Sequence, residues 1–66
     1  MATGTVEWFD PQQGTGLIVL DDGRKVPVRR VQIDGGGSQS LHPSDRVEFE
    51  LRESPSGLVA SGVYRL

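Results

Sequence analysis

The sequence predicts a small all-β domain in which five short antiparallel strands close into a barrel. Turn signals recur about every eight to twelve residues, which is the spacing typical of small sandwiches and barrels. Nine glycines and four prolines, together with the lack of a helical period in any window, argue against helices. An open sheet of this size would expose unpaired edges, so closure into a barrel is the favoured arrangement.

The first three strands are expected where apolar and β-branched residues gather between turn signals. They cover residues 4–9, 16–20 and 25–29. Residues 10–14, with the sequence Asp-Pro-Gln-Gln-Gly, predict the turn between the first two strands. Residues 21–23, Asp-Asp-Gly, are a strong hairpin signal between the second and the third. These aspartates are therefore interpreted as turn residues and not as a cation site.

The second half of the chain predicts a long connection followed by a hairpin. Residues 30–43 form the longest stretch without strand character, and the glycine run at 35–37 is expected to be a flexible loop. Residues 46–52 alternate between hydrophobic and charged side chains, as a half-buried strand does. The hydrophobic set is Val47, Phe49 and Leu51. A turn at 54–57 then leads into the last strand, at 58–66.

Alternation divides the second and third strands into an inner and an outer face. The inner face is expected to carry Gly16, Ile18, Val26 and Val28. The outer face is expected to carry Thr15, Leu17, Pro27 and Arg29. A proline within a strand lacks a ladder donor, so an edge position is favoured for the third strand over a specially shaped groove.

The orientation of Trp8 is left open by this pattern. Val6 is expected in the core, and Trp8 has the same parity along the strand, so strict alternation would bury it. Only a bulge near Trp8 and Phe9 would turn the ring outward. Burial as a core side chain and exposure on the outer face are therefore both compatible with the sequence.

Length and composition limit the class of protein. The 66 residues suffice for one domain, expected to span 1–66, and the absence of cysteine excludes disulfides and thiolate metal sites. No apolar run approaches the ~18 residues that span a bilayer, so a cytoplasmic protein without a membrane partner is expected. Seven basic and nine acidic side chains give a net charge of −2, yet four of the basic ones lie within residues 24–30. Charge is therefore polarised along the chain although its sum is acidic.

Nothing in the pattern supports catalysis, a metal or a cofactor. His42 is the only histidine, and neither cysteine nor an ordered pair of carboxylates stands near it. The glycine run at 35–37 lacks the lysine and helix of a phosphate-binding loop. The sequence therefore predicts a binding or interaction domain and not an enzyme.

Three segments resemble the bacterial cold-shock protein family. Residues 4–10, G-T-V-E-W-F-D, are similar to the family opening G-x-V-K-W-F-N. Residues 14–18, G-T-G-L-I, and 26–30, V-P-V-R-R, stand where the family carries its two ribonucleoprotein motifs, G-F-G-F-I and V-F-V-H-F. The resemblance runs the full length without a gap. It implies a five-stranded OB-type β-barrel and places Trp8 on the outer, nucleic-acid-binding face.

The departures from the family concentrate on that outer face. The family stacks bases on aromatic rings at the positions of Trp8, Thr15, Leu17, Pro27, Arg30 and Ser38. Only Trp8 keeps its ring. Arg29 stands where the family has a histidine, and Glu7 and Gln13 replace lysines. The inward positions, in contrast, are filled as in the family.

The resemblance and the charge pattern together predict a module for single-stranded RNA or DNA that binds more weakly than its family. The contact residues are expected to be Trp8, Leu17, Arg29 and Arg30, with Phe9 and Lys25 assisting. The family role that this implies is a nucleic-acid chaperone or a regulator of transcription or translation. The domain is expected to be a monomer or a weak dimer.

Two other interpretations remain open. The barrel could have lost its nucleic-acid ligand and serve protein–protein contact through the apolar side chains of Trp8, Leu17 and Pro27. It could also have been selected for the fold alone. The binding interpretation requires that Arg29 and Arg30 share the face of Trp8 and that nearby acids do not neutralise them.

Overall fold

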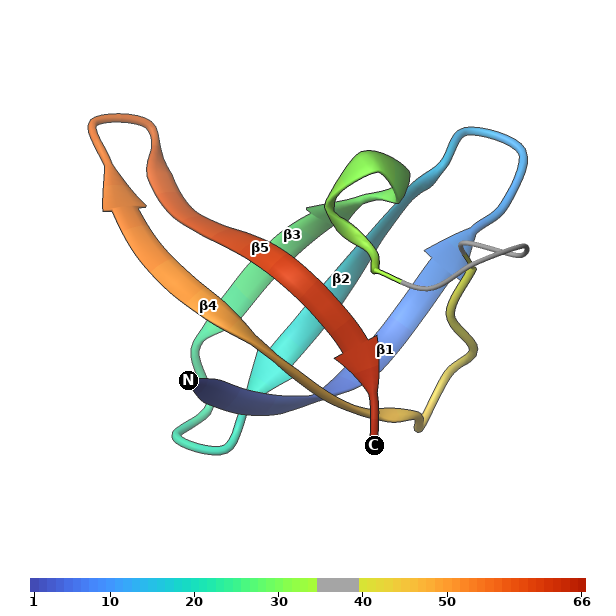
Figure 1. Ribbon diagram of the computed structural model, residues 1–66, viewed down its shortest axis with the longest axis horizontal. Coiled ribbons are helices and arrows are strands. Elements are labelled where there is room, and N and C mark those ends of the chain that lie inside the picture. Colours follow the sequence, from blue (N-terminus) through green and yellow to red (C-terminus); the bar gives the residue numbers. More distant parts are fainter. Residues whose placement is uncertain (35–39) are drawn as a thin grey trace.

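A computed structural model describes residues 1–34 and 40–66, which form one five-stranded antiparallel sheet (Figure 1). The strands are β1 (Ala2–Asp10), β2 (Thr15–Leu20), β3 (Lys25–Arg29), β4 (Arg46–Ser54) and β5 (Gly57–Arg65). They are hydrogen-bonded in the order β3-β2-β1-β4-β5. The all-β prediction is confirmed. The expected flexible loop at 35–37 and the family position at 38 lie outside the described residues.

The sheet curls until its two end strands meet, which makes it an OB-type barrel. In Figure 1, β4 and β5 pass in front of β2 and β3, and β3 lies against β5. A parallel bridge between Ile33 and Val63 joins the chain after β3 to β5. Because β3 ends the hydrogen-bonded order, Pro27 lies in an edge strand of the ladder, where its missing N–H is tolerated. The predicted edge position is confirmed.

Several local features differ from the sequence prediction, and β4 runs to Ser54, two residues beyond its predicted end. β1 begins at Ala2, two residues earlier than expected, because Ala2 pairs with Phe49 of β4. After β3, residues Arg30–Gln32 form a single 3-10 turn, η1, in a segment where no regular element was expected. Within the described residues, no helix is long and apolar enough to cross a membrane.

The interior of the barrel is entirely apolar in the described part of the chain. Its buried hydrophobic side chains are those of Val6, Ile18, Leu20, Val26, Val28, Ile33, Leu41, Val47, Phe49, Ala60 and Val63. The alternation predicted for β2, β3 and β4 is confirmed by this set, with Leu51 partly buried at its margin. Phe49 is the largest fully buried side chain and has no exposed surface.

The predicted turns have the expected local chemistry. The Asp10 carboxylate accepts the Gln12 N–H at 3.0 Å, and Gly14 closes that turn with φ 71°. Asp22 accepts the Arg24 N–H at 3.0 Å in the second turn, beside a glycine with φ 95°. Such a backbone angle is accessible to glycine at little cost.

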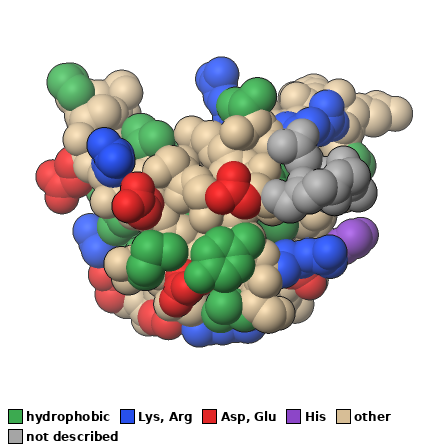
Figure 2. Space-filling model, viewed as in Figure 1, with side chains coloured by type: hydrophobic (Ala, Val, Ile, Leu, Met, Phe, Trp, Pro, Cys, Tyr) green, Lys and Arg blue, Asp and Glu red, His purple; other side chains and the backbone are tan. Residues whose placement is uncertain are grey.

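Four of the seven Lys and Arg side chains form ion pairs with carboxylates of the described residues. The Lys or Arg pairs are Arg24–Asp22, Lys25–Glu7, Arg46–Asp21 and Arg52–Glu50. On the face seen in Figure 2, acidic and basic side chains are interspersed around a small central group of hydrophobic ones. The net charge therefore says little about any one surface.

The Arg46–Asp21 pair joins the start of β4 to the β2–β3 hairpin. Arg46 Nη1 lies 2.8 Å from Asp21 Oδ1 and 3.0 Å from the hydroxyl of Thr5. The hydrogen bond from Arg46 lowers the pKa of the Asp21 carboxyl below its ordinary value. A group with a lowered folded-state pKa contributes stability above its unfolded pKa and loses it as pH falls through the folded value. This pair is therefore intact at neutral pH and is lost only in acid.

Candidate nucleic-acid interface

The outer face of β1, β2 and β3 carries three short rows of side chains that run across the strands. The rows are Thr5–Val19–Lys25, Trp8–Leu17–Pro27 and Asp10–Thr15–Arg29. The middle row is apolar, and Trp8 in it is 45% exposed. A cation stands on β3 at the end of each outer row. The face therefore combines an exposed aromatic ring with charges on either side of it.

A β-bulge in β1 turns Trp8 outward. Val6 pairs with Ile18 and the next register pair is Trp8 with Leu17, so Glu7 and Trp8 together oppose one residue of β2. The extra residue reverses the parity of β1 beyond Val6. Val6 is buried while Glu7 and Trp8 are both exposed. Of the two orientations that the sequence allowed for Trp8, exposure through a bulge is confirmed.

Phe9 does not share the outer face with Trp8. It pairs with Gly16, whose side of β2 faces the core, and its ring is partly buried against that core. A Cβ atom on Gly16 would lie 2.7 Å from Phe9 Cδ1 and 2.6 Å from the Trp8 carbonyl oxygen. The absence of a side chain at Gly16 is therefore what allows Phe9 to fold under the bulge.

We predict that Gly16→Ala destabilises the domain by about 1–3 kcal/mol, the usual cost of overpacking a core. The added methyl group meets backbone atoms of β1, which cannot move aside without disturbing the bulge. Urea unfolding followed by far-UV circular dichroism measures the loss. Gln13→Ala, in the exposed β1–β2 turn, serves as the control and should change stability by less than about 0.5 kcal/mol. Equal stability of the two variants would contradict the close approach at Gly16.

Arg29 is the cation of this face whose side chain is left without an acidic partner. It is the last residue of β3, its side chain is exposed, and no ion pair joins it to a described residue. Its backbone N–H donates to the side-chain oxygen of Gln32 at 2.8 Å, which fixes the main chain where β3 passes into η1. The main chain at Arg29 is therefore fixed at the edge of the face, and its exposed guanidinium is accessible to a ligand.

Arg30 is placed differently from Arg29. Its backbone N–H donates to the Gly14 carbonyl at 2.8 Å, and its guanidinium donates to the carbonyl of Pro11. The side chain lies against the bare Cα of Gly14, where a Cβ would be 3.2 Å from Arg30 Cζ. Arg30 is thus bound to the β1–β2 turn, at the end of the barrel and outside the three rows.

The acids nearest to this face do not neutralise the arginines. Glu7 Oε1 lies 3.5 Å from Nζ of Lys25, and the Asp10 carboxylate caps its own turn. Arg29 therefore meets both requirements that the sequence set for a binding face. Arg30 meets only the second, because it lies outside the rows beside Trp8.

The sequence of this chain matches a known protein family over nearly its whole length. The model of the "'Cold-shock' DNA-binding domain" family matches residues 2–66. The chain belongs to the cold-shock domain family. It is 43% identical to the major cold shock protein of Micrococcus luteus and 42% identical to a probable cold shock protein A of Mycobacterium tuberculosis, each over the full length of both chains. It is 38% identical to cold shock protein CspD of Bacillus subtilis, again over both full lengths.

A hollow of this cold-shock domain adjoins Arg29 and extends the outer face toward β5. Its volume is about 220 Å³, and it is lined by Pro27, Arg29, Gln32, Ser56, Leu58 and Val59. The last three residues come from the β4–β5 hairpin, which reaches β3 only because the barrel closes. Sequence reasoning missed them since no local pattern links residues 56–59 to β3.

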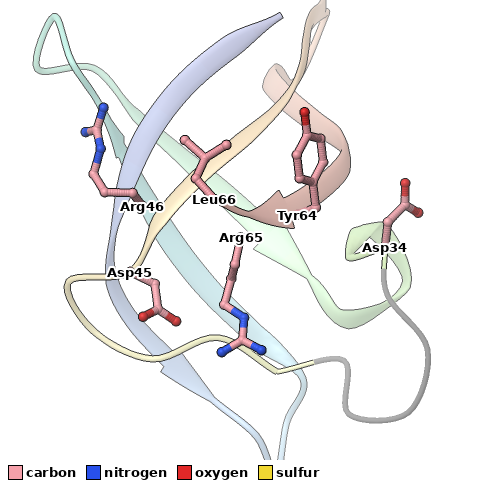
Figure 3. Close-up of a pocket in the computed structure, with 6 residues that line it drawn as sticks. All are labelled: Asp34, Asp45, Arg46, Tyr64, Arg65 and Leu66. Atoms are coloured by element: carbon pink, nitrogen blue, oxygen red, sulfur yellow. The ribbon is translucent and has the colours of Figure 1, made fainter.

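A second hollow, of about 530 Å³, lies where β4 begins and β5 ends (Figure 3). Its lining residues are Asp34, Asp45, Arg46, Tyr64, Arg65 and Leu66, and none of them belongs to the three rows. Two of its polar groups are already engaged, since Arg46 binds Asp21 and the Tyr64 hydroxyl donates to Glu48. The latter hydrogen bond raises the pKa of Tyr64 above its ordinary value. Charges of both signs make this hollow a poor match for a polyanion.

Proposed function

We propose that this cold-shock domain binds single-stranded RNA or DNA, weakly, through the outer face of β1, β2 and β3. The observation that supports the proposal is the combination on one face of an exposed Trp8, an apolar row beside it and an Arg29 that forms no ion pair with a described residue. Stacking of bases on aromatic rings beside a cation that meets the backbone is the general mode of single-strand recognition.

The residues of the face take different roles in this proposal. Trp8 is the stacking platform, and Leu17 and Pro27 continue its apolar surface across β2 and β3. The Arg29 guanidinium contacts a phosphate or lies flat on a base. Arg30 contributes charge from the end of the barrel, whereas Lys25, at the other end of β3, is paired with Glu7. Phe9 does not contact the ligand directly in this proposal. It is partly buried against the core and supports the bulge that exposes Trp8.

Weak binding follows from the number of rings on the face. A base stacked on an aromatic side chain is worth roughly 1–3 kcal/mol, and Trp8 is the one ring in the three rows. Leucine and proline give van der Waals contact without that stacking energy. The domain is therefore expected to bind through one strong stack and to depend on Arg29 for the rest of its affinity.

The direct test is a titration of Trp8 fluorescence with a short unstructured oligonucleotide. The domain has one tryptophan, so the reporter coincides with the site. Saturable quenching at low salt that weakens at 0.15 M, where the Debye length is about 8 Å, is the expected result. No response up to high micromolar oligonucleotide, in a domain shown to be folded, would overturn the proposal. Protein contact through Trp8, Leu17 and Pro27 would then become the function to test.

We predict that Arg29→Glu lowers affinity at low salt by at least about ten-fold, because it removes a phosphate contact and places a repelling charge there. The same titration measures it. Arg52→Glu is the matched control, since Arg52 is an exposed arginine of β4 outside the three rows and the change in net charge is identical. An equal loss in both variants would assign the effect to overall charge and remove Arg29 from the site.

A further inference from the structure

Glu7 forms an ion pair that crosses the candidate interface. Its Oε1 atom on β1 lies 3.5 Å from Nζ of Lys25 on β3. β2 separates these two strands in the sheet, so the pair spans the outer surface of β2. The Lys25 side chain is 58% exposed and that of Glu7 is 42% exposed. Both groups are therefore placed where a bound strand would meet them.

The pair lies beside the bulge at Trp8. Glu7 faces outward by simple alternation from the buried Val6, and the bulge exposes Trp8 next to it. An acidic residue thus precedes the stacking residue in β1, and the only lysine of the chain is paired with it. The charge of that end of the face is neutralised by two groups of this chain before any ligand arrives.

We infer that Glu7 limits and orients nucleic-acid binding by occupying Lys25, so that the phosphates of a bound strand lie at the Arg29 end of the face. The inference rests on the proposed function and adds to it a residue that restricts affinity. Lys25 and Arg29 are four residues apart on one strand, which is about 13 Å in an extended chain. That separation exceeds the Debye length of about 8 Å at physiological salt, so at that salt concentration the two ends act independently.

Removing either charge of the Glu7–Lys25 pair should change the affinity for an oligonucleotide. Glu7→Gln releases Lys25 and removes a repelling carboxylate, so binding at low salt should tighten by about five-fold, the effect of one unit charge at contact distance in water. The slope of log affinity against log salt should steepen by about 0.7, because one more phosphate is neutralised. Lys25→Gln should weaken binding and flatten the salt slope, because it leaves Glu7 uncompensated.

A double variant makes the inference sharp. Glu7→Gln with Lys25→Gln leaves that end of the face neutral, as it is in the parent chain. Affinity should therefore return to within about two-fold of the parent value, and the salt slope should return to that of the parent. If Lys25 contacted phosphate in spite of Glu7, the double variant would bind more weakly and with a flatter salt slope. That result would overturn the inference.

The experiment measures anisotropy of a labelled unstructured oligonucleotide at several salt concentrations. Glu50→Gln is the matched control, because Glu50 also forms an exposed pair at 3.5 Å, with Arg52, and its loss changes net charge equally. The inference fails if Glu7→Gln binds no more tightly than Glu50→Gln. Absence of binding in both the parent chain and Glu7→Gln would overturn the proposed function as well. Binding with equal affinity in all variants would overturn this inference alone.

Discussion

Phe49→Ala is expected to leave the domain largely unfolded at 25 °C. Phe49 has no exposed surface and is the largest fully buried side chain of the core. Truncation of such a phenylalanine costs about 3–5 kcal/mol, because transfer energy is lost and a cavity remains. A core of this size supplies only about 3–5 kcal/mol of net stability without disulfides or metal. The loss therefore equals the whole stability of the fold, and far-UV circular dichroism with urea titration measures it.

Leu51→Ala is the matched control on the same strand. Leu51 shares the inward direction of Phe49 but is only partly buried at the margin of the core. It should lose less than about 2 kcal/mol and keep a cooperative unfolding transition. A folded Phe49→Ala with a loss no greater than that of Leu51→Ala would mean that the barrel does not depend on this central ring.

The elements that could be predicted from the sequence are those fixed by local patterns. Strict alternation in β4 placed Val47 and Phe49 inside, and both are buried. Asp22 and Gly23 predicted the β2–β3 hairpin. In the structure the Asp22 carboxylate accepts the Arg24 N–H, and Gly23 has a positive φ. Such signals depend only on residues that are close in sequence, so they can be interpreted without knowledge of the fold.

The features that could not be predicted depend on the closed barrel or on a break in alternation. A period of two cannot indicate where a bulge inserts its extra residue, so the orientation of Trp8 stayed open. The Glu7–Lys25 pair joins strands that are not neighbours in the sheet. The hollow beside Arg29 needs Leu58 and Val59 from the last hairpin. Each of these is a tertiary arrangement without a local signal.

The division between a kept interior and an altered exterior has a physical basis. The inward side chains of β2 and β3 are buried apolar residues that stabilise the barrel through their area and packing. The outward ones at positions 17, 27 and 29 contribute little to that core, so they can change without loss of the fold. Binding energy on such a face depends on few residues, which makes Trp8 its most sensitive position.

Trp8→Ala is expected to weaken oligonucleotide binding by between about 5- and 150-fold, which corresponds to the roughly 1–3 kcal/mol of one base stack. Trp8 is 45% exposed beside Leu17, and neither Leu17 nor Pro27 carries a ring that could replace it. Because the variant lacks the intrinsic reporter, anisotropy of a labelled oligonucleotide at low salt is the measurement. Circular dichroism checks that the barrel remains folded.

Two further variants separate stacking from a general loss of aromatic surface. Trp8→Phe keeps a ring at the same place and should retain most of the affinity, because any aromatic face can stack with a base. Tyr64→Ala removes an aromatic side chain of comparable exposure, 37%, from β5, away from the three rows. It should leave binding unchanged. If Tyr64→Ala weakened binding as much as Trp8→Ala, the bound oligonucleotide would have to lie across β5. The outer face of β1, β2 and β3 would then not be the binding site.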